Sequence, residues 1–481
     1  MGITEPTGEE KKRTSTTDHV KFLWVKIVSM AKDVKQLGKD DPRRVYHAIK
    51  VAIAITLVSL LYYFRPIYDG FGSSTIWAVM TVVVVFEFTV GAAIYKCINR
   101  GCATLLAGVL GVGVQHLTVV CGETGRPIVL ALFIFGFAAC ATFLRFFPYL
   151  KARFDYGFTI FILTFTMVSV TGYRAEEVLT YARTRFVTIV LGVGLVMMIS
   201  IFVYPAWAGE DLHNLIANNI AKLANYLEGF QGEYFRMCEE EKEKCAEDSK
   251  TDKSFLQAYK SVLNSKSPEE NLATYARWEP FHGRFRLRHP WKLYLEVGVQ
   301  VRQLAYHIDA LNGHLTKNNN PKVPKEFKSH IEEPCRKICS ESSKALKALS
   351  SSIKEMSPPS SATFHMDKAK GAVEDLKSTL RDISELEHLN LLAIMPAATV
   401  ASTLIEVVGK MDKVVEAAEE LSSRAGFKAK LVPKEKLEKP LQILHRSMPV
   451  TPICVDGDVV IDIDELDEGK SLQGCKKVNI V

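Results

Sequence analysis

Six apolar stretches follow one another through the first 207 residues of the chain. Each is roughly 15–22 residues long, enough for a helix to cross the hydrocarbon core of a bilayer, which is about 30 Å thick. The pattern therefore predicts six transmembrane helices. They are expected at Val45–Phe64, Ile76–Ala93, Gly101–Val120, Pro127–Phe147, Tyr156–Val170 and Phe186–Trp207.

Charged residues become frequent from Gly209 onward, and apolar residues there recur at helical spacing. Three such stripes predict helices that bury one face in a core. The stripes are Leu212, Leu215, Ile216, Ile220, Leu223 and Leu227, then Val297, Val301, Leu304, Ile308, Leu311 and Leu315, and later Val373, Leu376, Leu380 and Ile383. The predicted fold class is an all-α membrane protein, with six transmembrane helices followed by a helical cytosolic domain.

One later segment, Leu391–Ile405, is apolar enough to suggest a seventh span. It is short for a crossing, contains Pro396 and is bounded by Glu387 and Glu406. A buried helix of the cytosolic domain is therefore the favoured interpretation.

Composition divides the chain into four parts. A polar leader, residues 1–44, precedes the membrane domain of residues 45–207, and the helical domain covers residues 208–427. The tail, residues 428–481, is basic and then acidic with little periodicity, so most of it is expected to be disordered. Because the leader has no apolar block followed by a small-residue cleavage site, the first stretch is interpreted as a retained span.

Cations in the short loops predict the orientation of the spans across the membrane. Arg43 and Arg44 precede the first stretch, and Lys96 lies between the second and third. Arg145, Lys151 and Arg153 lie between the fourth and fifth. The positive-inside bias places these ends in the cytosol, and an even number of crossings places both termini there. The loop before the sixth stretch is an exception, because it carries basic residues on the predicted outer side.

Several classes of function find no support in the sequence. It contains no Gly-x-x-x-x-Gly-Lys-Ser/Thr nucleotide loop and no nucleophile-and-base constellation, so neither an enzyme nor a cofactor is predicted. Cys335 and Cys339 lack partners at metal-site spacing and are interpreted as two unpaired thiols on a helix. The net charge is +6, and no nucleic-acid partner is expected.

Among the ionisable residues within or at the ends of the apolar stretches, four are singled out as candidates for a role in the membrane: Lys50, Glu87, Arg100 and Arg185. A charge at membrane depth needs a partner or a water-filled cavity. For Lys50 and Glu87 a structural ion pair is predicted, with Glu87 paired to Lys50 or to an arginine. The alternatives are that Lys50 extends to the interface and that Glu87 relays protons.

Arg100 and Arg185, together with Lys96 and Arg183, indicate a pathway for an anion. An arginine binds a carboxylate through two parallel hydrogen bonds and does not lose its charge. Several cations along one path would attract a dianion and still let it leave. The alternative for each arginine is an interface anchor that contacts lipid phosphate.

Several longer strings are more specific than any single residue. They are Asp41-Pro42-Arg43-Arg44-Val45, the segment Trp77–Phe88, Arg145-Phe146-Phe147-Pro148, Phe154-Asp155-Tyr156-Gly157, the segment Pro205–His213, Trp278-Glu279-Pro280 and the segment Phe281–Trp291. With these strings the chain, from about Asp41 to Phe427, resembles the plant aluminium-activated malate transporter family.

The resemblance implies a homodimeric channel in the lipid bilayer that passively conducts malate and other small anions out of the cytosol. It also implies that Arg100 and Arg185 line the pore. A regulatory segment is implied at Phe202–Trp207, with a plain membrane-exit hinge at Pro205 as the favoured alternative. The runner-up function is a proton-coupled organic-acid carrier.

The resemblance also raises two further expectations, activation by aluminium and the membrane in which the protein lies. An aluminium site would need oxygen ligands in outer loops, where the acids are Asp69, Glu176 and Glu177, although solvated loop acids are the commoner explanation. The resemblance to malate-exuding members favours the plasma membrane over the vacuolar membrane.

A basic run is expected either to face anionic lipid or, as favoured, to pair with acids of a neighbouring subunit. It comprises Arg277, Arg284, Arg286, Arg288, His289 and Lys292.

Overall fold

The computed structural model describes residues 8–63, 76–172, 178–236, 255–285, 289–316, 325–384 and 391–428. Within these ranges the regular structure is helical, apart from one isolated bridge between His282 and Phe285. The protein is therefore an all-α membrane protein, as predicted. The predicted tail, residues 428–481, lies almost entirely outside the described ranges.

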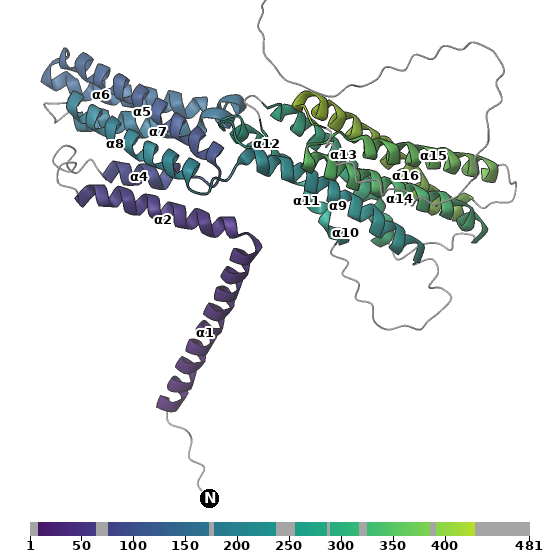
Figure 1. The fold of residues 1–481 in the computed structure, drawn as a ribbon. Helices are drawn as coiled ribbons and strands as arrows, with labels where there is room; N and C mark the ends of the chain where they lie inside the picture. The colour runs from purple at the N-terminus through teal and green to yellow at the C-terminus, as the bar shows by residue number, and fades with distance from the viewer. Residues whose placement is uncertain are drawn as a thin grey trace, which may run out of the picture. The chain divides into compact units, whose positions relative to one another are not determined.

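The leader and the first apolar stretch form two helices, α1 (Gly8–Asp40) and α2 (Pro42–Tyr63), drawn in purple in Figure 1. Asp41 separates them, and its carboxylate accepts a hydrogen bond from the Arg43 backbone N–H at 3.2 Å. Proline favours a new helix at its first position, because its fixed φ suits the first turn and its missing N–H is not needed there.

The other apolar stretches fall on α4 (Ile76–Val85), α5 (Val90–Val119), α6 (Gly122–Leu144), α7 (Pro148–Gly172) and α8 (Val178–Phe202). By length and composition, α5 to α8 each contain a candidate membrane span, and α4 is a shorter apolar helix. Among the described residues, the six predicted stretches thus fall on six helices in chain order, of which α5 to α8 qualify as candidate spans.

Several boundaries differ from the prediction: α6, α7 and α8 begin five to eight residues before the predicted stretches. The boundary between the second and third stretches differs most. The second stretch is interrupted at Phe86–Thr89, and α5 begins at Val90 and continues through the third stretch as one helix of 30 residues. Thr89 caps α5 by accepting a hydrogen bond from a backbone N–H of its first turn at 3.4 Å. Arg100 consequently lies almost three turns inside a helix instead of at the start of one.

Small residues allow the membrane helices to approach closely. α5 packs against α7 and α8, and α4 packs against α2 and α8. A Cβ added to Gly111 of α5 would lie 2.8 Å from the Val168 side chain of α7. A Cβ added to Gly192 of α8 would lie 3.0 Å from the Thr81 side chain of α4. Larger residues at either glycine would separate these helices.

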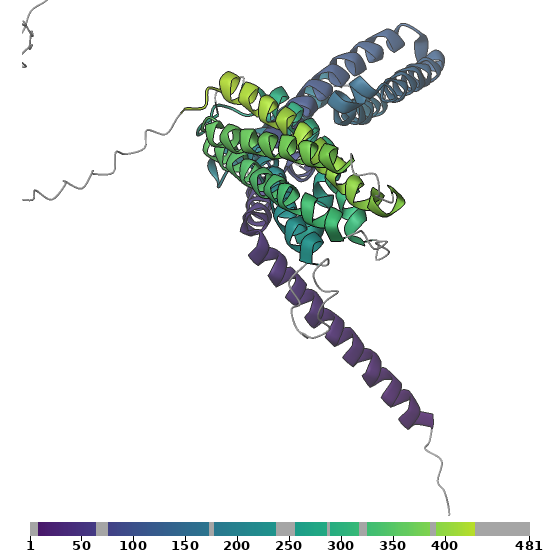
Figure 2. The ribbon, with the colours of Figure 1, turned by 90° about the vertical axis from the view of Figure 1, so that its right-hand side faces the viewer.

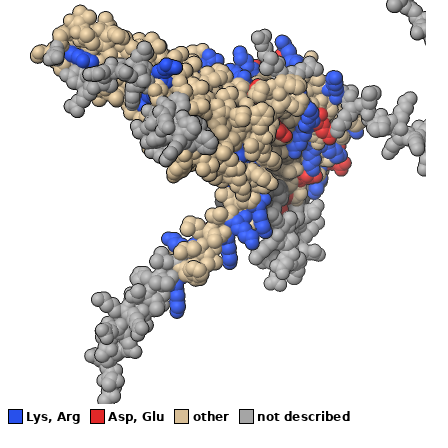
Figure 3. Space-filling model, turned by 60° about the vertical axis from the view of Figure 1, so that its left-hand side comes forward, with Lys and Arg blue, Asp and Glu red and all other residues tan. Residues whose placement is uncertain are grey.

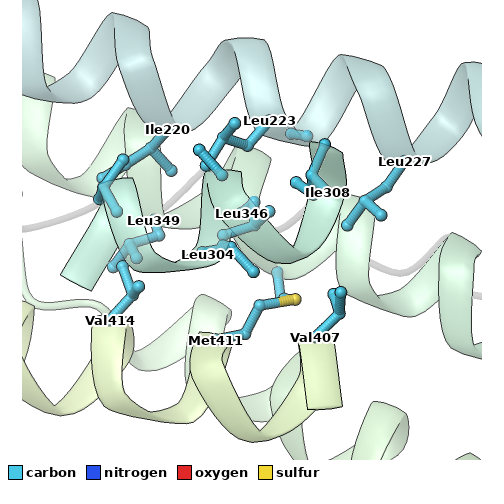
Figure 4. Close-up of a cluster of buried hydrophobic side chains, with 14 of the residues drawn as sticks. Ile220, Leu223, Leu227, Leu304, Ile308, Leu346, Leu349, Val407, Met411 and Val414 are labelled. Atoms are coloured by element: carbon cyan, nitrogen blue, oxygen red, sulfur yellow. The ribbon is translucent and has the colours of Figure 1, made fainter. Parts of the chain in front are cut away.

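The helical domain begins where the membrane helices end. Its elements are α9 (Ala208–Arg236), α10 (Phe255–Ala258), α11 (Lys260–Leu263), α12 (Lys266–Ala276), α13 (Trp291–Thr316), α14 (Lys325–Glu355), α15 (Ser360–Ser384) and α16 (Leu391–Ala425). Figure 2 shows the long helices lying beside one another. Their buried side chains form one core, in which Leu223, Ile308, Leu346 and Met411 come from four helices (Figure 4).

α16 contains the segment that suggested a seventh span. By length and composition, Ala393–Ala425 qualifies as a candidate span. Val400, Leu404 and Val407 are nevertheless buried in the core of the helical domain, and α16 packs against α13 and α14. The prediction of a buried helix is confirmed, because this apolar face is already covered by protein.

Charged side chains are unevenly distributed over the surface. Figure 3 shows lysine, arginine, aspartate and glutamate on the helical domain and cations along α1, whereas the membrane helices carry few charges on the face in view. An apolar surface next to a charged one is expected of a membrane part joined to a solvated part.

Candidate functional site

Arg100 of α5 is held inside the membrane helices, with 3% of its surface exposed. Its Nη1 donates a hydrogen bond to the Tyr156 hydroxyl of α7 at 3.3 Å. Among the described residues, its Nε has no hydrogen-bond partner, nor has the buried hydroxyl of Thr104 one turn further along the same face. The site thus combines a permanent cation with two polar groups that have no hydrogen-bond partner among the described residues. An anion could accept hydrogen bonds from both groups.

Arg185 of α8 is equally buried, with 2% of its surface exposed. Its guanidinium carbon lies 3.9 Å from the centre of the Trp77 ring of α4. A cation–π contact of this kind stabilises the charge by about 0.5–2 kcal/mol without neutralising it. Arg183, two residues earlier, is exposed. The sequence grouped Arg183 with Arg185, but only Arg185 is buried among the membrane helices.

The two buried arginines lie at different depths. The Val90 backbone N–H donates to the Ala206 carbonyl at 2.9 Å, so the start of α5 lies next to the segment that follows α8. With a rise of about 1.5 Å per residue, Arg100 lies about 15 Å from the start of α5, and Arg185 about 25 Å from the end of α8. Because α5 and α8 pack together, the two cations are roughly 10 Å apart along the helices.

A third cation belongs to the Arg100 site. Lys96 lies one turn before Arg100, and its Nζ is 5.6 Å from the centre of the Tyr156 ring. Lys96 also forms an ion pair with Glu87, in which the two side chains are 28% and 33% exposed. Glu87 therefore pairs with a lysine of the cationic site, where the sequence had predicted Lys50 or an arginine.

The segment Phe202–Trp207 is held by contacts at both ends. Near its start, Lys50 of α2 is buried and donates a hydrogen bond to the Tyr204 carbonyl oxygen at 3.3 Å. Tyr204 has a φ of 44°, a conformation that bends the chain at the end of α8. Trp207 stacks on the His282 ring with the centroids 3.8 Å apart. This geometry is that of a fixed bend, and a ligand response of the segment stays a prediction.

The predicted aluminium ligands Asp69, Glu176 and Glu177 lie outside the described residues. In the part of the chain that the structure describes, no three His, Cys, Asp or Glu side chains come together as a metal site. Cys335 and Cys339 are buried, and burial raises the pKa of both thiols, that of Cys335 to about 12. Both thiols are free and lie in the core of the helical domain, on α14.

Glu279, to which the sequence assigned no role, connects the helical domain to the membrane helices. Its carboxylate accepts hydrogen bonds from the Ala208 and Gly209 backbone N–H groups, which begin α9, the latter at 3.0 Å. The backbone N–H of Gly91, in the first turn of α5, also bonds to it. Burial raises the pKa of Glu279 to about 7, although these hydrogen bonds oppose the rise. The Trp-Glu-Pro string marked this residue without indicating its contacts.

Arg126 is a further cation that the sequence reading missed. Its Nη2 donates to the Gln115 side-chain oxygen of α5 at 3.1 Å, and the Gln115 amide donates to the Ser169 carbonyl of α7. These bonds connect α5, α6 and α7 near the ends of the helices that are distant from the helical domain. Arg126 directly precedes Pro127, where a predicted span begins, and this position in the sequence could have identified it as a candidate.

These features define a helical membrane protein with cationic sites inside its membrane helices. The chain belongs to the aluminium-activated malate transporter family, because the family described as "Aluminium activated malate transporter" matches residues 35–387.

Relatives in two plants match most of the chain. Aluminum-activated malate transporter 2 of Arabidopsis thaliana is 47% identical over 412 residues, which cover 85% of this chain and 81% of the relative. Aluminum-activated malate transporter 1 of the same plant is 43% identical over 471 residues, covering 95% and 94%. Aluminum-activated malate transporter 1 of Triticum aestivum is 40% identical over 410 residues, covering 84% and 87%.

Proposed function

We propose that the chain forms a passive channel for malate and other small anions. The observation that carries this proposal is the presence of two buried arginines at different depths of the membrane helices, Arg100 beside Tyr156 and Arg185 against Trp77. The family match and the names of the relatives support malate as one of the anions.

The cationic sites suit an ion that binds and then leaves. A carboxylate of malate can accept hydrogen bonds from a guanidinium, and Arg100 retains an Nε without a partner in the described residues. A second cation roughly 10 Å further along offers the next position, so neither site needs to bind the dianion tightly.

The Glu87–Lys96 ion pair supports a channel over a proton-coupled carrier. A proton relay requires a carboxyl group that gains and loses its proton during transport. Glu87 is paired with Lys96, so its carboxylate is engaged in an ion pair with a lysine of the cationic site. The carrier remains the alternative that the recording below distinguishes.

We infer that the helical domain and both termini are cytosolic. Arg43, Arg145 and Lys151 lie at the ends of membrane helices nearest the helical domain, and the positive-inside bias places such ends in the cytosol. A homodimer would place two sets of arginines around a shared axis. The plasma membrane is our preferred location over the vacuolar membrane, and fluorescent tagging in plant cells tests it.

Aluminium activation is proposed through Asp69, Glu176 and Glu177. External aluminium at acid pH should then raise the anion current, and replacement of these three acids by amides should abolish the rise without changing the basal current. An unchanged wild-type current with aluminium would discard the trigger and leave the channel proposal intact.

Current recording from cells that express the full chain tests the proposed function. A channel predicts a reversal potential that follows the malate gradient and ignores the pH gradient. A reversal potential that shifts with the pH gradient would indicate a carrier. The absence of any current at normal surface abundance would favour a membrane-anchored scaffold.

A further inference from the structure

A groove of about 1020 Å³ opens between α5, α6 and α7, at the ends of these helices nearest the helical domain. Its walls are mostly apolar and include Leu106 of α5, Phe137 and Ala141 of α6, and Phe161 of α7. α12, which contacts α5, brings Thr274, Arg277 and Trp278 to the same groove. In Figure 1, α12 lies beside this end of the membrane helices.

Two arginines give the rim of the groove a positive charge. Arg153 of α7 and Arg277, which follows α12, both line it and are both exposed. Arg153 donates from Nη1 to the Tyr149 hydroxyl at 2.8 Å, a neutral partner that leaves its charge in place. Among the described residues neither guanidinium forms an ion pair. Both cations are therefore available to an anionic group at the rim.

The combination of rim and walls fits an amphiphile better than a small anion. A dicarboxylate would gain nothing from an apolar wall that lies at membrane depth. An anionic phospholipid has a phosphate for the cations and an acyl chain for the wall. Tyr149 and Trp278 also lie at the rim, and such aromatic rings favour the headgroup level of a bilayer. Each cation near an anionic lipid surface contributes to binding.

We propose that this groove binds one anionic phospholipid from the leaflet that faces the helical domain, with the phosphate at Arg153 and Arg277 and an acyl chain between α5, α6 and α7. The site is distinct from the buried cations Arg100 and Arg185, and its existence does not depend on which anion the protein conducts.

Bound lipid would act on the membrane helices next to Arg100. The Arg153 carbonyl oxygen accepts hydrogen bonds from the Tyr95 hydroxyl and, at 3.4 Å, from the Asn99 amide of α5. Asn99 directly precedes Arg100. A headgroup that fixes Arg153 and Arg277 would therefore hold α7 and the helical domain together beside the cationic site.

Photolabelling of the full-length protein tests the proposal. The protein is reconstituted in phosphatidylcholine vesicles that contain a trace of phosphatidylserine with a diazirine in its acyl chain, or of the matching phosphatidylcholine probe. We expect the phosphatidylserine probe to label peptides containing Leu106 and Phe161 at least threefold more than the phosphatidylcholine probe. The double variant Arg153→Gln/Arg277→Gln should lose this preference, and the double Arg→Lys variant should keep it.

Two controls keep the result interpretable. Lys151→Gln removes a neighbouring exposed cation that does not line the groove, and it should leave the preference unchanged. Ala141→Trp fills the apolar wall and should reduce labelling by both probes. Equal labelling of the wild type by the two probes, or a preference that survives Arg153→Gln/Arg277→Gln, would overturn the proposal.

The competing occupant is a second copy of the chain. Cys102 and Cys140 line the groove and are exposed, so a bifunctional maleimide reports a neighbouring subunit there. Efficient cross-linking of two copies through these cysteines, without lipid labelling, would show that a subunit interface covers the groove and would also overturn the lipid site.

Discussion

The Glu279 carboxylate accepts a hydrogen bond from the Gly209 backbone N–H at 3.0 Å, and the backbone N–H of Gly91 also bonds to it. One side chain therefore caps α9 of the helical domain and α5 of the membrane helices. The N-terminus of a helix carries partial positive charge and unpaired N–H groups, so a carboxylate there stabilises both helices.

Glu279→Ala should destabilise the junction by about 1–3 kcal/mol, because buried backbone N–H groups lose their acceptor. Thermal unfolding of the purified protein in detergent measures this effect, and current per surface channel reports its functional consequence. Glu270→Ala is the matched control, since Glu270 is exposed on the preceding helix. Equal melting temperatures for the two variants would contradict the capping role.

The same carboxylate predicts a pH dependence of stability. Its pKa in the folded protein, about 7, lies above the ordinary 4.5, chiefly because of burial, with the charge of Asp211 adding to the rise. Between these values the folded protein binds more protons than the unfolded chain, so this group's contribution becomes less favourable as pH rises from about 4.5 to 7. His282, with its Nε2 3.8 Å from the carboxylate, is the basic group that faces it.

Melting temperatures of the wild type and of Glu279→Gln, measured from pH 5 to 8, test this dependence. The stability of the wild type relative to the variant should fall as the pH rises from 5 to about 7 and level off towards pH 8. A difference between the two proteins that is constant over this range would show that Glu279 does not titrate there.

Neutralising the buried arginines should reduce malate current strongly at near-normal surface abundance. Arg100→Ala and Arg185→Ala remove cations from the two levels of the proposed pathway, and the Arg→Lys versions should restore current only in part because the forked contact is lost. Arg183→Ala is the control, because Arg183 is exposed. Normal malate current through Arg185→Ala would exclude that residue from the pathway.

The positions of the spans were predictable because apolar stretches of bilayer length are a local property of the sequence. The break at Phe86–Thr89 was not predictable, since these four residues include no proline or glycine. It depends on partners distant in the chain, namely the Ala206 carbonyl that accepts from Val90 and the Glu279 carboxylate that bonds Gly91. Such contacts arise only when the helices pack.

For the site residues, too, identity was predictable from the local sequence, whereas depth and pairing were not. Arg100 and Arg185 could be selected because a charge in an apolar stretch is visible in the sequence. Their depth could not, because it follows from where α5 begins for Arg100 and from the bounds of α8 for Arg185. The pairing of Glu87 with Lys96, across the turn between α4 and α5, likewise depends on that boundary.

The Glu87–Lys96 pair should tune the cationic site more than it stabilises the fold. Both side chains are partly exposed, so Glu87→Gln should cost at most about 1 kcal/mol of stability. It should also leave the Lys96 ammonium unneutralised beside Tyr156 and increase malate affinity. The double variant Glu87→Gln/Lys96→Gln should reverse that gain. The wild type, Glu87→Gln, Lys96→Gln and the double variant form a double-mutant cycle, and concentration–current curves for these four proteins measure the coupling between the two side chains. Additive effects would indicate that the two side chains act independently.

Close packing at Gly209 gives a prediction with an internal control on the same helix. A Cβ at Gly209 would lie 2.4 Å from the Trp291 ring and 3.2 Å from the Glu279 carboxylate, so Gly209→Ala should force the ring away and disturb the cap of α9. A loss of about 1–3 kcal/mol is expected. A Cβ at Gly232, also in α9, meets nothing within 4 Å. Gly232→Ala should therefore stabilise the helix by up to about 1 kcal/mol, because alanine has the higher helix propensity. Thermal unfolding of both variants measures the contrast, and a Gly209→Ala protein as stable as Gly232→Ala would show that Trp291 can move without cost.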